Sequence, residues 1–230
     1  MEILKSFLKF IRNPVYIEDT LPFNKQAVKE IGLLFIFKFL TSIFILISVY
    51  APLIYIFNVE DSNEKQTFLR SLLSAFIIAP ILEEFFFRYW LKNKKALALF
   101  FVIISLFITL FFLHQERYFR LSLFFLTCLL MFSLLANFKK INMSERADRF
   151  FKNNFWVWYY MSAIIFGLIH GLNYKTDNLW LLVIPLTLSQ ILGGLVYGYT
   201  RMKYGMWSNI SLHMLFNLIL TSIGFAFPAD

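Results

Sequence analysis

APILEEFFFR, at residues 79–88, places two adjacent carboxylates and an arginine inside an otherwise apolar segment that runs from about Phe68 to Leu91. A charged side chain at the centre of a bilayer costs at least ~2.5–3.5 kcal/mol, so a group of three implies pairing or function. In a helix Glu84 and Arg88 share a face, whereas Glu83 is turned ~100° away from Glu84. The pattern predicts one carboxylate paired with the arginine and one carboxylate free for chemistry.

The chain as a whole has the composition of a helical membrane protein. Of its 230 residues 59% are hydrophobic, and 30 are phenylalanine. Because Cys128 is the single cysteine, neither an intrachain disulfide nor a cysteine metal site can form within one chain. The net charge of +8 comes from basic residues clustered between apolar runs. We therefore expect contact with the anionic headgroups of a lipid bilayer and no binding of nucleic acid.

The apolar runs predict an all-α fold, a polytopic transmembrane bundle of about seven spanning helices, since each approaches the ~20 residues that a bilayer requires. The expected spans are approximately Ile31–Phe57, Phe68–Leu91, Ala96–Leu113, Tyr118–Phe138, Phe155–Leu172, Leu179–Tyr199 and Met206–Phe227. We expect residues 31–230 to form one transmembrane domain, and residues 1–30 to form a cytoplasmic interfacial segment that begins with an amphipathic helix. The apolar stripe of that helix comprises Ile3, Leu4, Phe7, Leu8 and Ile11.

Lysines and arginines are distributed unevenly among the predicted connections. One side carries most of them, in the segment before the first span and at residues 92–95, 139–152 and 201–203. By the positive-inside rule this side is cytoplasmic. The sequence thus predicts an integral protein of a prokaryotic plasma membrane with its N-terminus in the cytoplasm and its C-terminus outside.

Two polar residues in the spans have simple interpretations. Lys38 lies about two turns from the basic end of the first span, so we expect its side chain to snorkel to the interface. His114 ends the third span beside other polar residues and is expected to be interfacial.

Two further spans carry histidines, in FGLIH at residues 166–170 and HMLFN at residues 213–217. Taken singly, His170, His213 and Asn217 could each be no more than interhelical hydrogen bonds. Together with the residues of the second span, they are nearly all the strongly polar side chains deep in the spans, and their burial costs least if they converge on one cavity. A glutamate with two histidines in a water-accessible cavity can activate water, while cationic or amide donors stabilise an oxyanion.

The three motifs, Glu-Glu-xxx-Arg, Phe-xxx-His and His-xxx-Asn on successive helices, resemble those of the CPBP family. These are the CAAX-protease and bacteriocin-processing (Abi) intramembrane proteases, which include the type II CAAX prenyl endopeptidases. The resemblance covers roughly Phe68–Asn217 and implies an intramembrane endopeptidase. Its partner would be a membrane-associated or lipid-anchored peptide or protein substrate.

The resemblance also implies a role for the matching residues. Glu83 would be the general base and, with His170, would activate a water for attack on a peptide carbonyl. His213 and Asn217 would form the oxyanion hole.

In the same resemblance, Glu84 and Arg88 would orient and support the site. The sequence has no His-Glu-xx-His pair, the commonest helical zinc motif. We therefore expect a glutamate-dependent protease with no cofactor, and treat zinc held by two histidines and a glutamate as the weaker alternative.

Two departures from the family pattern carry structural expectations. Tyr89 and Trp90 follow Arg88 where the family commonly has a glycine, so the helix is expected to continue. The long segment between Arg88 and His170 leaves room for an inserted helical hairpin at residues 95–138. Counting residues along the spans puts Glu83 in the cytoplasmic half of the membrane and His170 in the outer half, so their contact does not follow from the sequence.

Two other functions use the same polar cluster. A proton-coupled transporter would use it as a proton relay, although no inverted repeats or clearly broken helix pairs are evident in the sequence. A non-catalytic, peptide-binding immunity protein would need the cavity but no activated water. Replacing Glu83 by glutamine separates the three, because it removes the base and keeps the shape.

Overall fold

The computed structural model describes residues 2–61, 72–93 and 145–226. In these ranges the chain is mostly helical, as predicted. The described residues also contain one short antiparallel strand pair, β1 (Glu60–Asp61) and β2 (Tyr174–Lys175), in which Glu60 pairs with Lys175.

Three helical segments are long and apolar enough to cross a membrane: Lys25–Phe57, Phe155–Asn173 and Met206–Ala226. A fourth is obtained if Leu179–Leu186 and Leu188–Tyr204, which are bent by 44° relative to each other, form one broken span. These segments agree in position with four of the seven predicted spans. The described residues thus support three or four spans, and the predicted count of seven is not confirmed.

Three of the predicted spans need separate comment. Ala96–Leu113 and Tyr118–Phe138, and with them the hairpin predicted at residues 95–138, lie outside the described residues. The span predicted at Phe68–Leu91 is helical over its described part. It is not among the apolar spans, and it carries Glu83, Glu84 and Arg88.

The first long segment consists of α2 (Lys25–Ile45), a π-helical turn η1 (Leu46–Tyr50) and α3 (Ala51–Phe57). Asn24 begins it by accepting a hydrogen bond from the backbone N–H of Ala27 at 2.9 Å. Asn58 ends the segment as its C-cap, in the left-handed conformation with a φ of 48°.

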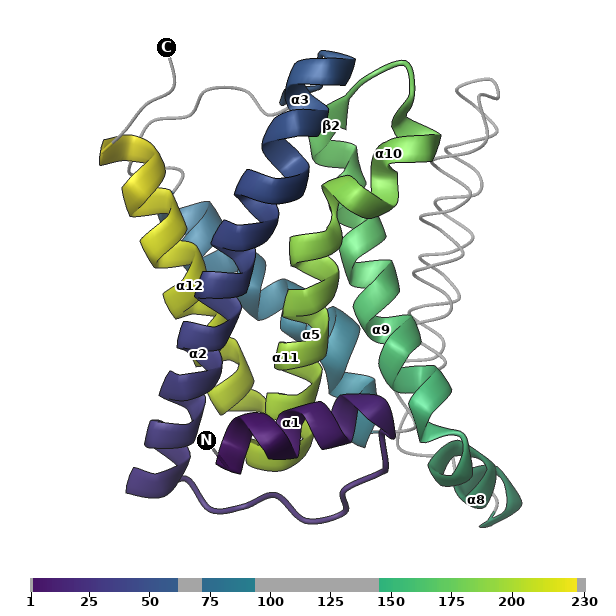
Figure 1. The fold of residues 1–230 in the computed structure, drawn as a ribbon. Coiled ribbons are helices and arrows are strands. Elements are labelled where there is room, and N and C mark those ends of the chain that lie inside the picture. The colour runs from purple at the N-terminus through teal and green to yellow at the C-terminus, as the bar shows by residue number, and fades with distance from the viewer. Residues whose placement is uncertain (1, 62–71, 94–144, 227–230) are drawn as a thin grey trace, which may run out of the picture.

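The segment that carries the glutamates consists of η2 (Leu72–Ile78), which is π-helical, and α5 (Ala79–Lys92). Pro80 lies in the first turn of α5, which continues directly from η2, so its missing N–H removes one helical hydrogen bond where the two helices join. Tyr89 and Trp90 continue the helix beyond Arg88, as predicted. In Figure 1 α5 runs obliquely through the bundle.

The remaining helices follow the second gap. They are α8 (Glu145–Asn153), α9 (Phe155–Ile169), the short 3₁₀ turn η5 (His170–Asn173), α10 (Leu179–Leu186), α11 (Leu188–Tyr204) and α12 (Met206–Ala226). Pro185 lies within α10, where a proline disrupts the helix, and the bend falls at Thr187 directly after it. The predicted single span at Leu179–Tyr199 is therefore a broken one.

α11 packs closely against α9 because glycine occupies the contact. A Cβ atom at Gly194 would lie only 2.7 Å from the Cα of Ala163 on α9. A Cβ atom at Gly167 would lie 2.2 Å from Ile191 on α11. Small residues at these positions allow the backbones of α9 and α11 to approach each other closely.

α1 (Glu2–Arg12) lies across the end of the bundle where α2 begins and α11 ends (Figure 1). Ile3, Phe7 and Phe10 are its buried residues, and the Phe7 ring meets Tyr199 at a centroid distance of 5.4 Å. The predicted stripe was wrong at Leu8, which is 51% exposed. Phe10 is buried instead, and its ring meets Tyr159 on α9 and Tyr199 on α11, each at a centroid distance of 5.1 Å.

Lys38 contradicts the prediction that it snorkels, because its side chain is buried at 3% exposure. Its Nζ donates to the Ser42 hydroxyl at 3.0 Å and to the backbone carbonyl of Ser189 at 3.3 Å. The ammonium group is therefore held between α2 and α11.

Candidate active site

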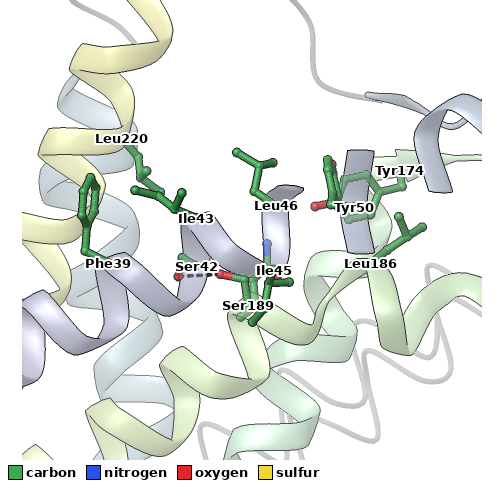
Figure 2. Close-up of a pocket in the computed structure, with 11 residues that line it drawn as sticks. Phe39, Ser42, Ile43, Ile45, Leu46, Tyr50, Tyr174, Leu186, Ser189 and Leu220 are labelled. Atoms are coloured by element: carbon green, nitrogen blue, oxygen red, sulfur yellow. Dashed lines mark hydrogen bonds between the residues drawn. The ribbon is translucent and has the colours of Figure 1, made fainter. Parts of the chain in front are cut away.

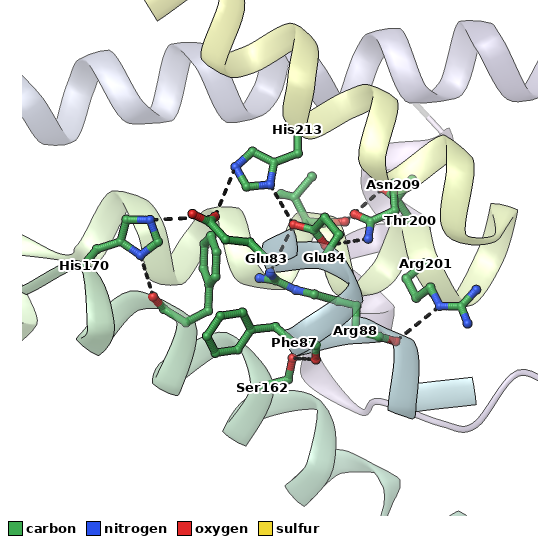
Figure 3. Close-up of polar contacts among 12 residues, drawn as sticks. Glu83, Glu84, Phe87, Arg88, Ser162, His170, Thr200, Arg201, Asn209 and His213 are labelled. Carbon is green, nitrogen blue, oxygen red and sulfur yellow. Dashed lines mark hydrogen bonds and ion pairs between the residues drawn. The ribbon is translucent and has the colours of Figure 1, made fainter. Parts of the chain in front are cut away.

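Glu83 on α5, His170 at the end of α9 and His213 in the middle of α12 lie close together (Figure 3). Glu83 Oε2 lies 4.0 Å from Nε2 of His170 and 3.8 Å from Nε2 of His213. Glu83 and His170 are therefore neighbours, although residue counting placed them in opposite halves of the membrane. Glu83 and His170 approach each other between an oblique α5 and η5, the 3₁₀ turn that directly follows α9.

Glu84 is the fully buried carboxylate of the pair, at 0% exposure. It accepts hydrogen bonds from Nη1 of Arg88 at 3.1 Å, from Nδ1 of His213 at 2.7 Å and from Nδ2 of Asn209 at 2.5 Å. The predicted pairing of Glu84 with Arg88 is confirmed. A buried carboxylate with three donors is well compensated, so Glu84 is suited to hold its neighbours in place.

Arg88 is equally buried, and aromatic rings surround its guanidinium group. Its Cζ lies 3.9 Å from the centroid of the Phe166 ring and 5.7 Å from that of Tyr197. In the part of the chain that the structure describes, Nε and Nη2 have no hydrogen-bond partner. The ring faces provide cation–π stabilisation in place of those hydrogen bonds.

Glu83 differs from its neighbour in having a carboxylate oxygen left over. Oε2 is buried and has no hydrogen-bond partner among the described residues, although it faces both histidines. The side chain is 27% exposed. Glu83 therefore lacks the arginine that pairs with Glu84 and lies within ion-pair distance of the two histidines instead.

The two histidine rings are oriented by hydrogen bonds on the far side from Glu83. Nδ1 of His170 donates to the Phe166 carbonyl at 2.7 Å, and Nδ1 of His213 donates to Glu84. Each ring therefore presents Nε2 to Glu83. The His213 ring also stacks on Tyr197 at a centroid distance of 4.4 Å, which limits its rotation.

Asn217 has a different environment from the other predicted residues. Its Nδ2 donates to the backbone carbonyl of Ala75 at 2.8 Å. The described contacts do not join it to Glu83 or to either histidine. Asn209, one turn before His213 on α12, contacts Glu84 instead, and its i, i+4 spacing from His213 is the sequence signal that could have identified it.

Two more side chains missed by the sequence hold α5 in place. Ser162 on α9 donates to the Phe87 carbonyl at 2.8 Å, and Nε of Arg201 on α11 donates to the Arg88 carbonyl at 3.2 Å. The assignment of Arg201 to a cytoplasmic connection was wrong, because it lies within α11 and is buried. Both bonds satisfy backbone carbonyls of the helix that carries Glu83.

Glu83, His170 and His213 are the side chains that a metal ion would have to use. Across residues 2–61, 72–93 and 145–226, no group of three histidine, cysteine, aspartate or glutamate side chains is arranged to hold a metal ion.

A family model described as Type II CAAX prenyl endopeptidase Rce1-like matches residues 65–219, a range that includes all three motifs. The chain belongs to this family. Membership in the Rce1-like family, together with the apolar spans, makes it an integral membrane protein, and it supports a protease that acts on a membrane-associated peptide. The resemblance to CPBP-type proteases is confirmed. Searches among curated proteins and among solved structures gave no match to this Rce1-like chain.

Proposed function

We propose that the chain is an intramembrane endopeptidase that hydrolyses a peptide bond of a membrane-associated or lipid-anchored peptide or protein. The observation that carries the proposal is the unpaired Oε2 of Glu83, which faces Nε2 of both His170 and His213. Beside it, Glu84 is fully buried and already accepts three hydrogen bonds, so it is less suited to take a proton from water.

Glu83 and His170 are suited to bind the attacking water. Their atoms are 4.0 Å apart, so one water can lie at ~2.8 Å from each. Glu83 takes a proton from this water, and the hydroxide oxygen bonds to the carbonyl carbon. When the C–N bond breaks, the same proton passes from Glu83 to the leaving amine, which restores the carboxylate.

His213 is the donor proposed for the oxyanion. When both ring nitrogens carry a proton, Nε2 donates towards the site while Nδ1 donates to the Glu84 carboxylate. Asn217 would be the second donor. One of the two N–H bonds of its amide is used by the Ala75 carbonyl, which leaves the other for the substrate.

We propose the topology that the charge distribution predicts, with the N-terminus in the cytoplasm and the C-terminus outside. Residues 31–230 would form the protease domain, and residues 1–30 would lie at the cytoplasmic interface. The site would open towards the cytoplasm, at the end of the second span that carries Glu83.

The decisive experiment compares wild type with Glu83→Gln on an internally quenched, prenylated CAAX peptide. Loss of the base should lower the cleavage rate by roughly 10²–10⁴-fold while peptide binding persists. Glu145→Gln, at an exposed glutamate on α8, is the matched control and should cleave normally. Cleavage by Glu83→Gln at the wild-type rate would exclude Glu83 as base. If wild type binds the peptide but never cleaves it, the chain is a peptide-binding protein instead.

Metal dependence is tested on the same substrate. Cleavage should continue after dialysis against a strong chelator, because the proposed water is activated by a carboxylate and a histidine. Loss of cleavage that zinc restores would instead indicate a zinc site at Glu83, His170 and His213.

A further inference from the structure

A partly open cavity lies between α2 and η1 on one side and β2, α10, α11 and α12 on the other (Figure 2). Its volume is about 250 Å³. Apolar side chains such as Phe39, Leu46 and Leu220 form much of its wall, while Ser42, Ser189 and Gln190 contribute polar groups. The site residues around Glu83 do not line it.

Behind the serines of this cavity lies the ammonium group of Lys38. The side chain is 3% exposed, and its Nζ contacts the Ser42 hydroxyl, the Ser189 carbonyl and, at 3.8 Å, the Phe216 ring. Within the described ranges, no carboxylate lies within ion-pair distance of it. A buried cation without a counter-ion is costly in a membrane helix, so its presence points to an anionic ligand.

Ser42 lies between Lys38 and the cavity, and its hydrogen bonds decide which group it presents to a ligand. A hydroxyl has two acceptor lone pairs and one proton. Both lone pairs are used, by Lys38 Nζ at 3.0 Å and by the Ser189 hydroxyl at 2.9 Å. The O–H of Ser42 therefore remains to donate to an acceptor in the cavity, with the positive charge of Lys38 directly behind it.

Gln190 contributes a hydrogen-bond acceptor to the cavity. Its Oε1 is buried and has no hydrogen-bond partner among the described residues. An unsatisfied buried acceptor calls for an N–H or O–H donor. The cavity thus offers a cation-backed donor and an open acceptor next to apolar walls.

The C-terminal residue of an apolar peptide meets all of these demands at once. Its carboxylate is an anionic acceptor, its backbone N–H is a donor, and its side chain is apolar. At ~30 Å³ for each water-sized group, the cavity holds roughly eight non-hydrogen atoms, close to the nine of a leucine residue that ends in a carboxylate. A fatty acid would supply the carboxylate and the apolar chain but no N–H for Gln190.

We propose that this cavity binds the C-terminal residue of an apolar peptide, with the carboxylate at Ser42, in front of Lys38, and the backbone N–H at Gln190. As a site for the end of a substrate or product it rests on the proposed function, whereas the binding itself requires no cleavage.

The test measures binding of two probes to the purified full chain in an uncharged detergent by fluorescence polarisation. The probes are Leu-Leu-Leu with an N-terminal dye and a free C-terminal carboxylate, and the same peptide with a C-terminal amide. The acid should bind about ten-fold more tightly than the amide, as expected for one charge-assisted hydrogen bond. Glu83→Gln should show the same preference, because it removes the proposed base and leaves the cavity unchanged.

Lys38→Met should abolish the preference for the acid. Lys29→Met, at an exposed lysine on the same helix, should retain it. If Lys38→Met does not fold, Ser42→Ala provides the same test, and the comparison of acid with amide in wild type requires no variant. Gln190→Leu should weaken binding of the peptide acid severalfold.

Equal binding of acid and amide in wild type would overturn the proposal, as would an unchanged preference in folded Lys38→Met. Competition by octanoate as strong as that by N-acetyl-leucine would indicate a fatty-acid site and would overturn the assignment to a peptide end. If wild type cleaves the substrate but shows no preference for the peptide acid, the proposed cavity ligand is wrong and the proposed function stands. If wild type prefers the peptide acid but cleaves no substrate, the proposed function is wrong and the proposed cavity ligand stands.

Discussion

The surroundings of Glu84 and of Lys38 show two ways of burying a charge in this bundle. Glu84 receives hydrogen bonds from Arg88, His213 and Asn209, so its charge is fully compensated. Lys38 contacts a hydroxyl, a carbonyl and a ring, none of which carries a negative charge. Breaking a compensated buried pair destabilises a protein, whereas removing an uncompensated charge relieves a cost. The two regions should therefore respond to substitution with opposite signs.

The largest effect on stability is expected for Arg88→Met. This variant leaves Glu84 buried without its cation, which should lower the free energy of unfolding by about 3–5 kcal/mol. Thermal unfolding in detergent measures the loss, and exposed Arg146→Met on α8 is the control. A melting temperature equal to that of wild type would mean that the pair is not a stabilising element.

Asn209→Ala should have the next largest effect. It removes one donor from a charged acceptor, a loss of about 1.5–3 kcal/mol. Because Glu84 also orients His213, the cleavage rate should fall while the Michaelis constant changes little. Asn209→Ser, which keeps a donor, should recover part of the rate. If stability falls and the rate does not, Asn209 supports the fold without positioning the site.

Lys38→Met should act in the opposite direction and more weakly. Removal of the uncompensated cation should raise the free energy of unfolding by about 1 kcal/mol in the absence of ligand. The apolar peptide acid should stabilise wild type in a concentration-dependent way and should leave the variant unaffected. A variant less stable than wild type would show that the three neutral contacts outweigh the burial cost.

An effect on stability of similar size to that of Lys38→Met, but of opposite sign, is expected for Asn217→Ala. Its bond to the Ala75 carbonyl joins neutral groups, so its loss should cost about 0.5–1.5 kcal/mol. As a donor to the oxyanion, however, Asn217 should account for about 10²–10³ in the cleavage rate. A drop in stability with normal cleavage would restrict Asn217 to an interhelical bond between α12 and η2.

Much of the site could be predicted because its rules are local. The pairing of Glu84 with Arg88 follows from their four-residue spacing, and Glu83 is directed elsewhere by the pitch of the same helix. Each is a property of a single helix, so no knowledge of its neighbours is required. The positions of the apolar spans around α2, α9 and α12 were predictable for the same reason.

Other features depended on how helices pack, and there the predictions were incomplete or wrong. Lys38 has a free route to the interface on an isolated helix, but α11 lies against it and supplies the Ser189 carbonyl. Arg201 looks like a connection charge until α5 places the Arg88 carbonyl beside it. Both outcomes are set by a partner that is distant in sequence.

Composition and motif order along the chain were thus enough to determine a membrane-embedded helical protein of a protease family and the helices that carry its polar residues. The tertiary structure decided that Glu83 meets both histidines, that Asn209 contacts Glu84, and that Lys38 lies behind a cavity. The reason is physical. A helix defines the directions of its own side chains, but the distance between two side chains on different helices depends on their tilt, their bends and the glycine contacts between them.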